Sequence, residues 1–437
     1  MRASGMFLAA LALILLAGCG SDKKDSSSAT PLEPELSKDP VTLTFFNYAG
    51  ISDLTFQTLI EEPVKKKYPY ITIKMTEKGV SLPDLVASGN PPDLIHATNG
   101  VALQAVIDLK LYADLTPLMK RHKFDLSIFK DGVIEDIRRQ SANRNEIVGL
   151  PANNNMAALY YNKDIFDKFG IPYPRDGMTW DETYQLAKLL TRQEAGVAYR
   201  GFTMQHTLLL NNNQLSLRLL DPATDKPLQN QDQWARLFQN WKRFFEISGN
   251  ELTDITYGSG SNDFLKIRNV AMAAWGNSVV GIETMNDPSF NWDMVTLPVF
   301  PEAPGVSTQM HTPLFIISPT TKHMDQAFQV VAEMFSTDVQ LQSVRTGRPS
   351  LMKDAMYNQA IGTDLRSMAD KNKRAFADMK PASYPEQLSS YELVARNAFN
   401  NQFKEYLLGL KDLNTALRVA TDQMTKDVEA EKAKRKN

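Results

Sequence analysis

Residues 41–75, VTLTFFNYAGISDLTFQTLIEEPVKKKYPYITIKM, indicate the fold class of this chain. Up to Phe45 the apolar residues alternate with threonines, which is the two-residue period of a β-strand. From Phe56 onward apolar residues recur at helical spacing, and ITIKM (71–75) returns to a strand pattern. The segment PDLIHAT (92–98) is a third strand of the same kind. Strands that alternate with helices predict an α/β fold with a largely parallel sheet.

Two later segments carry helix boundaries that can be read locally. In YYNKDIFDKFGIP (160–172), Asn162 is suited to cap a short helix and Gly170 to end it. TWDE (179–182) has the Thr-x-x-Glu form of a capping box and opens a helix that we expect to reach Leu190. Further strand patterns lie at 270–275, 292–298 and 314–318, and an amphipathic helix pattern lies at 324–336.

The C-terminal half also contains a broad apolar stripe at helical spacing, from Trp234 to Phe245, which predicts a surface that faces the core. From Ser389 the chain reads as helices, and we expect its charged tail, 426–437, to fray. No repeat with a period of 20–50 residues is present, which excludes a solenoid or a propeller.

The N-terminal residues have the layout of a secretory signal peptide. Arg2 precedes the apolar run MFLAALALILLAG, which is too short to span a membrane. The run ends in LAGC, a motif that resembles the lipobox of bacterial lipoproteins, in which cleavage before the cysteine exposes it for acylation. We therefore expect a lipoprotein signal peptide at 1–18, lipidation of Cys19 (palmitate included), and a lipidated flexible tether at 19–40. The alternative is an ordinary signal peptide with an incidental cysteine.

Composition limits the fold and its partners. Cys19 is the single cysteine, so no intramolecular disulfide can form and the fold depends on its core. With 43% hydrophobic residues such a core is available, and the chain from Val41 onward is long enough for two domains. The formal net charge of −2 gives no basis for a nucleic-acid partner. No segment after residue 18 is long and apolar enough to span a bilayer.

Motifs of common enzymes are absent: no GxSxG, HExxH, Walker A or GxGxxG stretch occurs. The five histidines are scattered without zinc-ligand spacing, and we expect no catalytic residue, metal or cofactor. The Ser-x-x-Lys matches at Ser127 and Ser350 lack the companion motifs of acyl-transfer enzymes. Acid pairs suited to glycosidase chemistry stay open as an alternative, because aspartates and glutamates occur throughout the chain.

Several landmarks follow one another in a set order: PPDLIHAT, YYNKDIFDKFGIP with TWDE, VAMAAWGN, VTLPVFP and QAFQVVAEMF. Together they resemble extracellular solute-binding protein family 1, the carbohydrate-type receptors of ABC importers. The resemblance runs from about Val41 to the last helices, and the Tyr-Tyr-Asn-Lys-Asp-x-Phe stretch with Trp-Asp-Glu is its most specific part. It implies a two-lobed periplasmic-binding-protein-like fold. Each lobe would be a mostly parallel sheet flanked by helices, and hinge crossings would join the lobes around a ligand cleft.

The resemblance also implies lobes that are discontinuous in sequence. We place lobe 1 at 41–149 plus 301–348, and lobe 2 at 150–300 plus 349–437. The hinge crossings are expected near Pro151, Leu297–Pro298 and Arg348–Pro349. At such crossings the backbone can rotate while each lobe keeps its internal structure.

Ligands of open α/β sheets bind beyond the carboxyl ends of the strands. That rule points to Asn47 and Tyr48, to Thr98 and Asn99, and to 275–277. From these we take five ligand-binding candidates: Asn47, Tyr48, Asn99, Trp275 and Asn277. Asparagine amides can hydrogen-bond sugar hydroxyls, and aromatic rings can cover the C–H face of a sugar. Trp275 has an alternative place in the core, because it ends an apolar run.

Four further ligand-binding candidates lie in predicted crossings or loops. Asn154 follows the crossing at Pro151, although it could belong to a polar turn only. Tyr257 lies in the Gly- and Ser-rich stretch TYGSGSND. His311 is equally suited to a structural role, and Arg348 could bind ligand or brace the hinge.

The combined interpretation is a receptor and not an enzyme. We expect a lipid-anchored monomer on the extracytoplasmic face of the bacterial cell membrane. It would capture a sugar or oligosaccharide by domain closure and deliver it to the transmembrane subunits of an ABC permease, with no nucleic-acid partner. The alternatives are a lipid-anchored secreted glycoside hydrolase, and a surface sensor or adhesin on the same fold.

Overall fold

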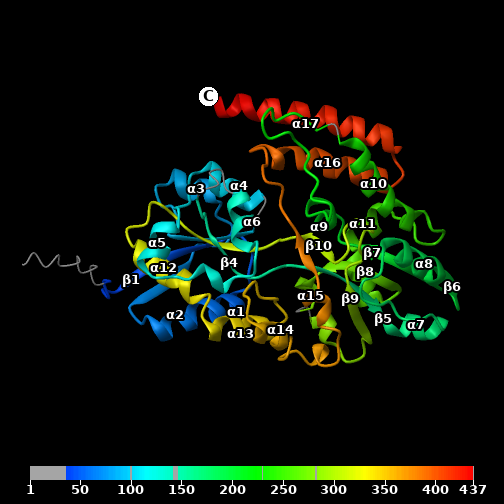
Figure 1. Ribbon diagram of the computed structural model, residues 1–437, viewed down its shortest axis with the longest axis horizontal. Coiled ribbons are helices and arrows are strands. Elements are labelled where there is room, and N and C mark those ends of the chain that lie inside the picture. The colour runs from blue at the N-terminus through cyan, green and yellow to red at the C-terminus, as the bar shows by residue number, and fades with distance from the viewer. Residues whose placement is uncertain (1–35, 99–100, 141–145, 229, 281–282, 437) are drawn as a thin grey trace, which may run out of the picture. The chain divides into compact units, whose positions relative to one another are not determined.

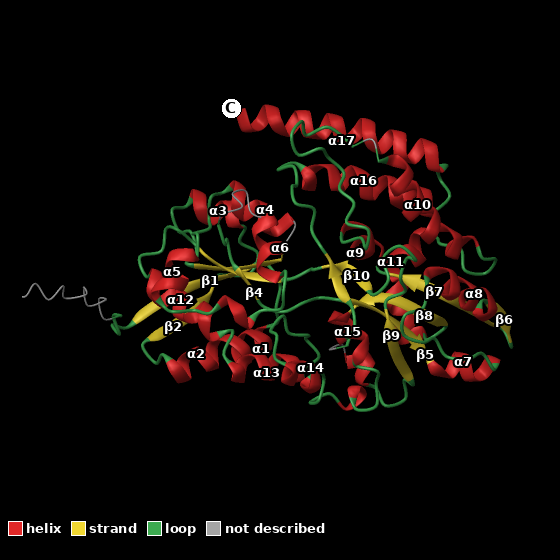
Figure 2. Ribbon diagram, viewed as in Figure 1, coloured by secondary structure: helices red, strands yellow, loops and turns green. Residues whose placement is uncertain are grey.

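The structure is a computed structural model that describes residues 36–98, 101–140, 146–228, 230–280 and 283–436. Residues from Asp39 onward belong to one compact unit (Figure 1). Its described strands form two five-stranded sheets and one two-stranded sheet, and helices cover them (Figure 2). None of the described helices is long and apolar enough to cross a membrane.

The first sheet has the strand order β2-β1-β3-β11-β4. Its strands are β1 (Val41–Asn47), β2 (Ile71–Met75), β3 (Leu94–Thr98), β4 (Leu150–Pro151) and β11 (Pro313–Ile317). β1 pairs in parallel with β2 and β3, as expected from the alternation of strands and helices. β11 instead runs antiparallel to β3 and β4.

Helices from both halves of the chain surround this sheet. They are α1 (Asp53–Phe56), η1 (Gln57–Glu61), α2 (Glu62–Lys67), α3 (Leu82–Ala87), α4 (Val101–Asp108), α5 (Thr116–Arg121), η2 (Leu126–Ile128), α6 (Val133–Gln140), α12 (Met324–Glu333) and α13 (Thr337–Arg345). One cluster of buried apolar residues fills the space between them. It draws on residues 41–150 and 310–335, with Leu351 and Tyr384 added from later in the chain.

The second sheet has the order β6-β7-β8-β5-β9. Its strands are β5 (Ala157–Asn162), β6 (Arg192–Glu194), β7 (Val197–Met204), β8 (Val270–Gly276) and β9 (Trp292–Thr296). The prediction of a mostly parallel sheet is wrong here: among its described strands only β7 and β8 pair in parallel. The reason is the chain path. β5 leads away from the first sheet and β9 leads back toward it, so the two must run in opposite directions.

The same reasoning applies to β4 and β11, which leave and re-enter the first sheet and are also antiparallel.

The remaining strands, β10 (Val306–Gln309) and β12 (Lys380–Ala382), pair with each other in parallel. β10 therefore does not join the first sheet, although the predicted lobe 1 includes it. The predicted lobe boundaries and hinge roles stay predictions.

The helices around the second sheet come from two separate parts of the chain. They are α7 (Lys163–Phe169), α8 (Trp180–Leu190), α9 (His206–Asn211), α10 (Gln231–Lys242), η3 (Arg243–Glu246), α11 (Asp254–Asn262), η4 (Asp263–Ile267), η5 (Asn277–Val279), η6 (Glu283–Asn286), α14 (Ala355–Ala360), η7 (Arg366–Met368), α15 (Arg374–Ala377), α16 (Glu392–Leu407) and α17 (Leu413–Lys436). A second buried apolar cluster lies among them.

The helix caps and the apolar stripe that the sequence predicts for this part of the chain are confirmed. Asn162 caps α7 through Asp164 N–H, and Gly170 ends the helix with a φ of 64°. Thr179 and Glu182 form the predicted capping box, and α8 ends at Leu190. The predicted core-facing stripe is also confirmed, since its aromatic residues are buried in α10 and η3.

The expectation of a frayed C-terminal tail is wrong, because α17 continues to Lys436. Tertiary contacts explain its order. Val428 is buried in the second cluster. Arg435 lies over the Tyr391 ring and forms an ion pair with Asp108 of α4 at 3.2 Å. These contacts stabilise the helical conformation of the charged tail, which the sequence alone did not predict.

His96 of β3 is fully enclosed in the first core, where its ring packs against Phe45 and Phe315. Burial lowers the pKa of His96 to about 3. The unfolded chain binds a proton near pH 6.5, whereas the native state does not until about pH 3. The stability that depends on neutral His96 is therefore present above pH 6.5 and is lost as the pH falls toward 3.

We expect His96→Phe to flatten this acid response. At pH 5 the wild-type protein should have lost about 2 kcal/mol of unfolding free energy through this one site, and the variant should not. Urea denaturation between pH 7 and pH 5 measures the difference. Parallel pH profiles for the two proteins would show that His96 is not the titrating group.

Candidate functional site

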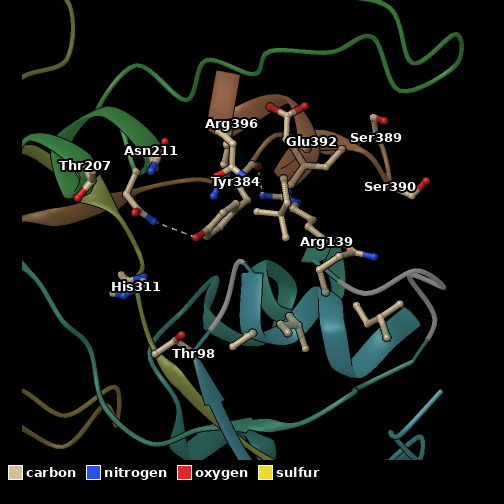
Figure 3. A pocket seen from close by; sticks show the side chains of 18 of the residues that line it. Thr98, Arg139, Thr207, Asn211, His311, Tyr384, Ser389, Ser390, Glu392 and Arg396 are labelled. Atoms are coloured by element: carbon tan, nitrogen blue, oxygen red, sulfur yellow. Dashed lines mark hydrogen bonds between the residues drawn. The ribbon is translucent and has the colours of Figure 1, made fainter. Parts of the chain in front are cut away.

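A cavity of about 990 Å³ lies between elements of the first sheet and helices of the second (Figure 3). The first side contributes residues at the ends of β1 and β3, and from α4 and α6: Tyr48, Thr98, Ala102, Leu103, Gln104, Ile107, Asp108 and Arg139. The second side contributes residues from α9, α16 and α17, among them Thr207, Asn211, Asn212, Glu392, Arg396 and Arg435. The volume is in the range of small-molecule sites.

Tyr384 braces one wall of the cavity. Its hydroxyl donates to the Met310 carbonyl at 2.7 Å and accepts from the Asn212 amide at 3.3 Å. Tyr384 is labelled in Figure 3. Its backbone N–H donates to Asp136 of α6 at 3.4 Å, and its carbonyl accepts from Arg139 at 3.3 Å. Tyr384 therefore ties α6 to elements of the other side.

Asp136 lies beneath this wall and is mostly enclosed. Burial raises the pKa of the Asp136 carboxyl to about 6, although Tyr384 N–H and the Arg139 guanidinium both oppose the rise. Arg139 donates to the same carboxylate at 3.3 Å. The charge of Arg139 is thus engaged by a neighbour on its own helix.

Polar side chains pack closely around Gly276 near the crossing from β4 to β5. The Gly276 N–H donates to Gln205 Oε1 at 3.1 Å. A Cβ at Gly276 would lie 2.8 Å from Asn155 Oδ1, so a larger residue there would displace the Asn155 side chain. Asn155 N–H donates to the His311 carbonyl at 2.9 Å, while its buried Oδ1 has no partner among the described residues. Asn155 and Gln205 both line the cavity.

Glu392 opens α16 at the upper edge of the cavity. Its two carboxylate oxygens accept the backbone N–H groups of Leu219 at 2.7 Å and Leu220 at 3.1 Å. Burial raises the pKa of the Glu392 carboxyl, and the charge of Arg396 partly opposes this. Burial also lowers the pKa of His311, with a smaller contribution from the same arginine.

Two of the predicted ligand-binding residues line this cavity. Tyr48, at the end of β1, is 42% exposed and packs its ring edge-on against Phe46. His311 reaches the cavity from the segment before β11 and is labelled in Figure 3. They come from distant parts of the sequence, and the pairing of β1 and of β11 with β3 brings them to the same region.

The other predicted residues lie outside the lining of this cavity. The Asn47 side-chain amide donates to the Ile51 carbonyl at 2.7 Å and accepts from the Ile51 N–H at 3.0 Å. Asn277 donates to the Gly347 carbonyl at 3.3 Å, and Arg348 donates to Thr346 at 2.7 Å and Thr55 at 3.3 Å. Asn99 lies outside the described residues. Their contact with a ligand stays a prediction.

Three more predicted residues, from the crossing between the sheets, from α11 and from β8, also lie outside this lining. Asn154 is buried, and its N–H donates to the Pro349 carbonyl at 3.0 Å. Tyr257 stacks on His206 with 4.2 Å between ring centroids, and burial raises the pKa of Tyr257 to about 12. Trp275 is half-buried and packs against the second core, close to Gly260 of α11. A ligand contact at these residues also stays a prediction.

Sequence reasoning missed the residues that α16 brings to the cavity, above all Glu392 and Arg396. The C-terminal segment showed helical periodicity, but charged residues are frequent along it and none carries a local motif. Only the packing of α16 on the rest of the unit distinguishes Glu392 and Arg396 from the other charged residues of this segment. Among the described residues no group of three or more metal-ligating side chains is suited to hold an ion.

A model of the bacterial extracellular solute-binding protein family matches residues 50–341. The multiple sugar-binding protein of Streptococcus mutans is 26% identical over 196 residues, 44% of this chain and 41% of that protein. The sn-glycerol-3-phosphate-binding periplasmic protein of Agrobacterium fabrum is 30% identical over 118 residues, 26% of this chain and 25% of that protein. The matched stretches thus span less than half of either curated relative.

Solved structures match over most of the chain. A sugar transporter of Rhizobium etli in an open conformation has a TM-score of 0.71 at 18% identity, with 88% of this chain and 99% of that chain covered. An ABC substrate-binding protein of Listeria monocytogenes in complex with cycloalternan has a TM-score of 0.71 at 17% identity, with 90% and 100% covered. These likenesses show the two-lobed α/β fold that the sequence predicts.

Proposed function

Since this chain belongs to the bacterial extracellular solute-binding proteins, we propose that it is a receptor that captures a sugar or oligosaccharide. The ligand would be held between the two lobes and delivered intact to an ABC import permease. The observation that carries this proposal is the cavity, whose polar side chains come from elements around both sheets and surround a volume of about 990 Å³. The names of the Streptococcus and Rhizobium relatives support a sugar as the ligand class.

The lining has the chemistry that a sugar requires. Asn155, Gln205 and Asn211 offer amide groups for hydroxyls, and Tyr48 offers an exposed aromatic face. We further propose that the predicted residues outside this lining contribute when the lobes close: Asn47, Asn99, Asn154, Tyr257, Trp275, Asn277 and Arg348. Closure would occur at crossings near Pro151, Leu297–Pro298 and Arg348–Pro349.

The carboxylates at the cavity favour a receptor over a glycoside hydrolase. Asp108 is paired with Arg435, and both oxygens of Glu392 accept backbone N–H groups. A hydrolase needs one carboxyl group as acid and another as base or nucleophile, both free to reach the glycosidic bond. Neither carboxylate has that freedom, so we propose no enzymatic activity and no cofactor.

Ligand binding should compact the protein. A ligand shifts the lobes only by its differential affinity for the closed arrangement, and contacts from both sheets supply that difference. We expect the bound sugar to lower the radius of gyration in solution scattering, to leave the circular dichroism spectrum unchanged, and to be recovered intact. Hydrolysis of the sugar, or tight binding without compaction, would contradict the proposal.

We also propose that the receptor is a monomer held at the extracytoplasmic face of the membrane through acylated Cys19, which lies outside the described residues. Two or more acyl chains anchor a protein stably, whereas one chain holds it only marginally. Cys19→Ala should move the protein into the medium or the soluble fraction, with unchanged melting temperature and ligand affinity. Fractionation and immunoblotting measure this, and Ser26→Ala in the same tether is the control. Membrane retention of the cysteine variant equal to wild type would exclude the anchor.

A further inference from the structure

Three arginines line the cavity, and two of them have counter-ions. Arg139 donates to the Asp136 carboxylate at 3.3 Å. Arg435 pairs with Asp108 at 3.2 Å. Arg396, on the cavity-facing side of α16, is the third (Figure 3).

Arg396 is half-buried and has no hydrogen bond or ion pair with any other residue that the structure describes. The carboxylate one helical turn earlier, Glu392, is directed to the backbone N–H groups of Leu219 and Leu220. Its distance from the guanidinium exceeds that of an ion pair. The charge of Glu392 acts on the guanidinium only through space. A partly desolvated guanidinium without a direct ion pair is unfavourable, and a bound anion would compensate it.

The groups around Arg396 are compatible with an anion. His311 is held neutral by burial and by the adjacent positive charge, which lower its pKa. A neutral imidazole still presents one N–H donor. Asn211 and Thr207 on α9 face the same space with further donor groups (Figure 3). The nearest acid of the lining, Glu392, already has its negative charge stabilised by two N–H donors.

We propose that the sugar bound in this cavity is acidic, with a carboxylate or a phosphate group, and that Arg396 binds that group. The inference rests on the proposed receptor function and adds the charge class of its ligand. Guanidinium is suited to either anion, because its planar donors match two oxygens at once. Arg396 would then determine specificity against the many neutral sugars that the remaining amide groups could accept.

The test is isothermal titration calorimetry of the purified protein with three groups of ligands. The first group is neutral disaccharides such as maltose and cellobiose. The second is hexuronates, namely glucuronate and digalacturonate, and the third is glucose 6-phosphate with sn-glycerol 3-phosphate. We expect binding in the second or the third group, and comparison of those two distinguishes a carboxylate from a phosphate.

Arg396→Gln should weaken binding of the acidic sugar by at least about tenfold, since charge-assisted hydrogen bonds are lost. Arg396→Lys should retain part of the affinity, as it keeps the charge without the planar donor pair. Arg418→Gln removes the same charge from the exposed surface of α17 and should leave affinity unchanged. Melting temperatures of all variants control for folding, and the loss of affinity should diminish at high salt.

Tight binding of neutral sugars alone, unaffected by Arg396→Gln, would overturn the inference and leave the receptor function in place. An acidic ligand whose affinity is equal in Arg396→Gln and wild type would overturn the role of Arg396. Absence of binding in all three groups would overturn the inference together with a sugar as the ligand class.

Discussion

Gly201→Ala is expected to destabilise the protein by at least about 3 kcal/mol, and to leave little folded protein at 37 °C. Gly201 lies in β7, directly against the backbone of α8. A Cβ there would overlap the carbonyl oxygen of Ala187 and lie 2.7 Å from its carbonyl carbon and Cα. Backbone atoms cannot change rotamer, so α8 or β7 must shift as a whole. Chemical denaturation of purified protein measures the loss.

Hydrogen bonds leave little room for such a shift. The Gly201 N–H donates to Thr191 Oγ1 at 3.0 Å, and that hydroxyl donates to the Ala187 carbonyl at 2.7 Å. The control is Gly258→Ala in α11, where a Cβ meets nothing within 4 Å. That substitution should be neutral or stabilising by up to about 1 kcal/mol, because alanine favours helix more than glycine does. Equal stabilities for the two variants would contradict the packing argument.

Glu392→Ala should lower the free energy of unfolding by about 2–5 kcal/mol. The variant leaves the buried N–H groups of Leu219 and Leu220 without an acceptor, and each unsatisfied donor costs about 1–3 kcal/mol. It also removes an acidic residue from the first turn of α16, where a negative charge is favourable. Removal of a buried charge offsets part of the loss, which is why the range is wide.

Glu392→Gln is the matched variant, because it keeps the side-chain size and one carbonyl acceptor while it removes the charge. We expect it to cost less than half as much as Glu392→Ala in the same urea titration. Equal losses for the two variants would show that the charge, which both remove, stabilises this junction and that the acceptor pair does not. Hydrogen exchange at Leu219 and Leu220 should rise in the alanine variant.

Features of the fold that depend only on residues close together in the sequence could be predicted. The caps at Asn162 and Gly170, and the capping box at Thr179, are satisfied within a few residues of themselves. The strands starting at Val41 and Ile71 follow from a two-residue period that any half-buried strand shows. The two-lobed fold came from the order of landmarks, which is a resemblance and not a physical derivation.

Strand direction and the cavity lining could not be predicted in this way. The antiparallel pairing of β5 with β9 is set by where the chain crosses between the sheets, and no residue in either strand encodes it. The strand-end rule identified Tyr48, and the search of predicted crossings and loops identified His311. Arg396 was not identified, because it is distinguished from other helical arginines by its place at the cavity and by the absence of a hydrogen bond or ion pair to any residue that the structure describes.

The last helix has a practical consequence for anyone who wishes to purify or immobilise this protein. Arg435, which lines the cavity, is the penultimate residue of α17. An affinity tag or fluorescent protein joined directly after the helix would therefore begin beside the cavity, where a histidine tag could occupy or block it. Biosensors built from this receptor should carry their reporter elsewhere, or place a long flexible spacer before it.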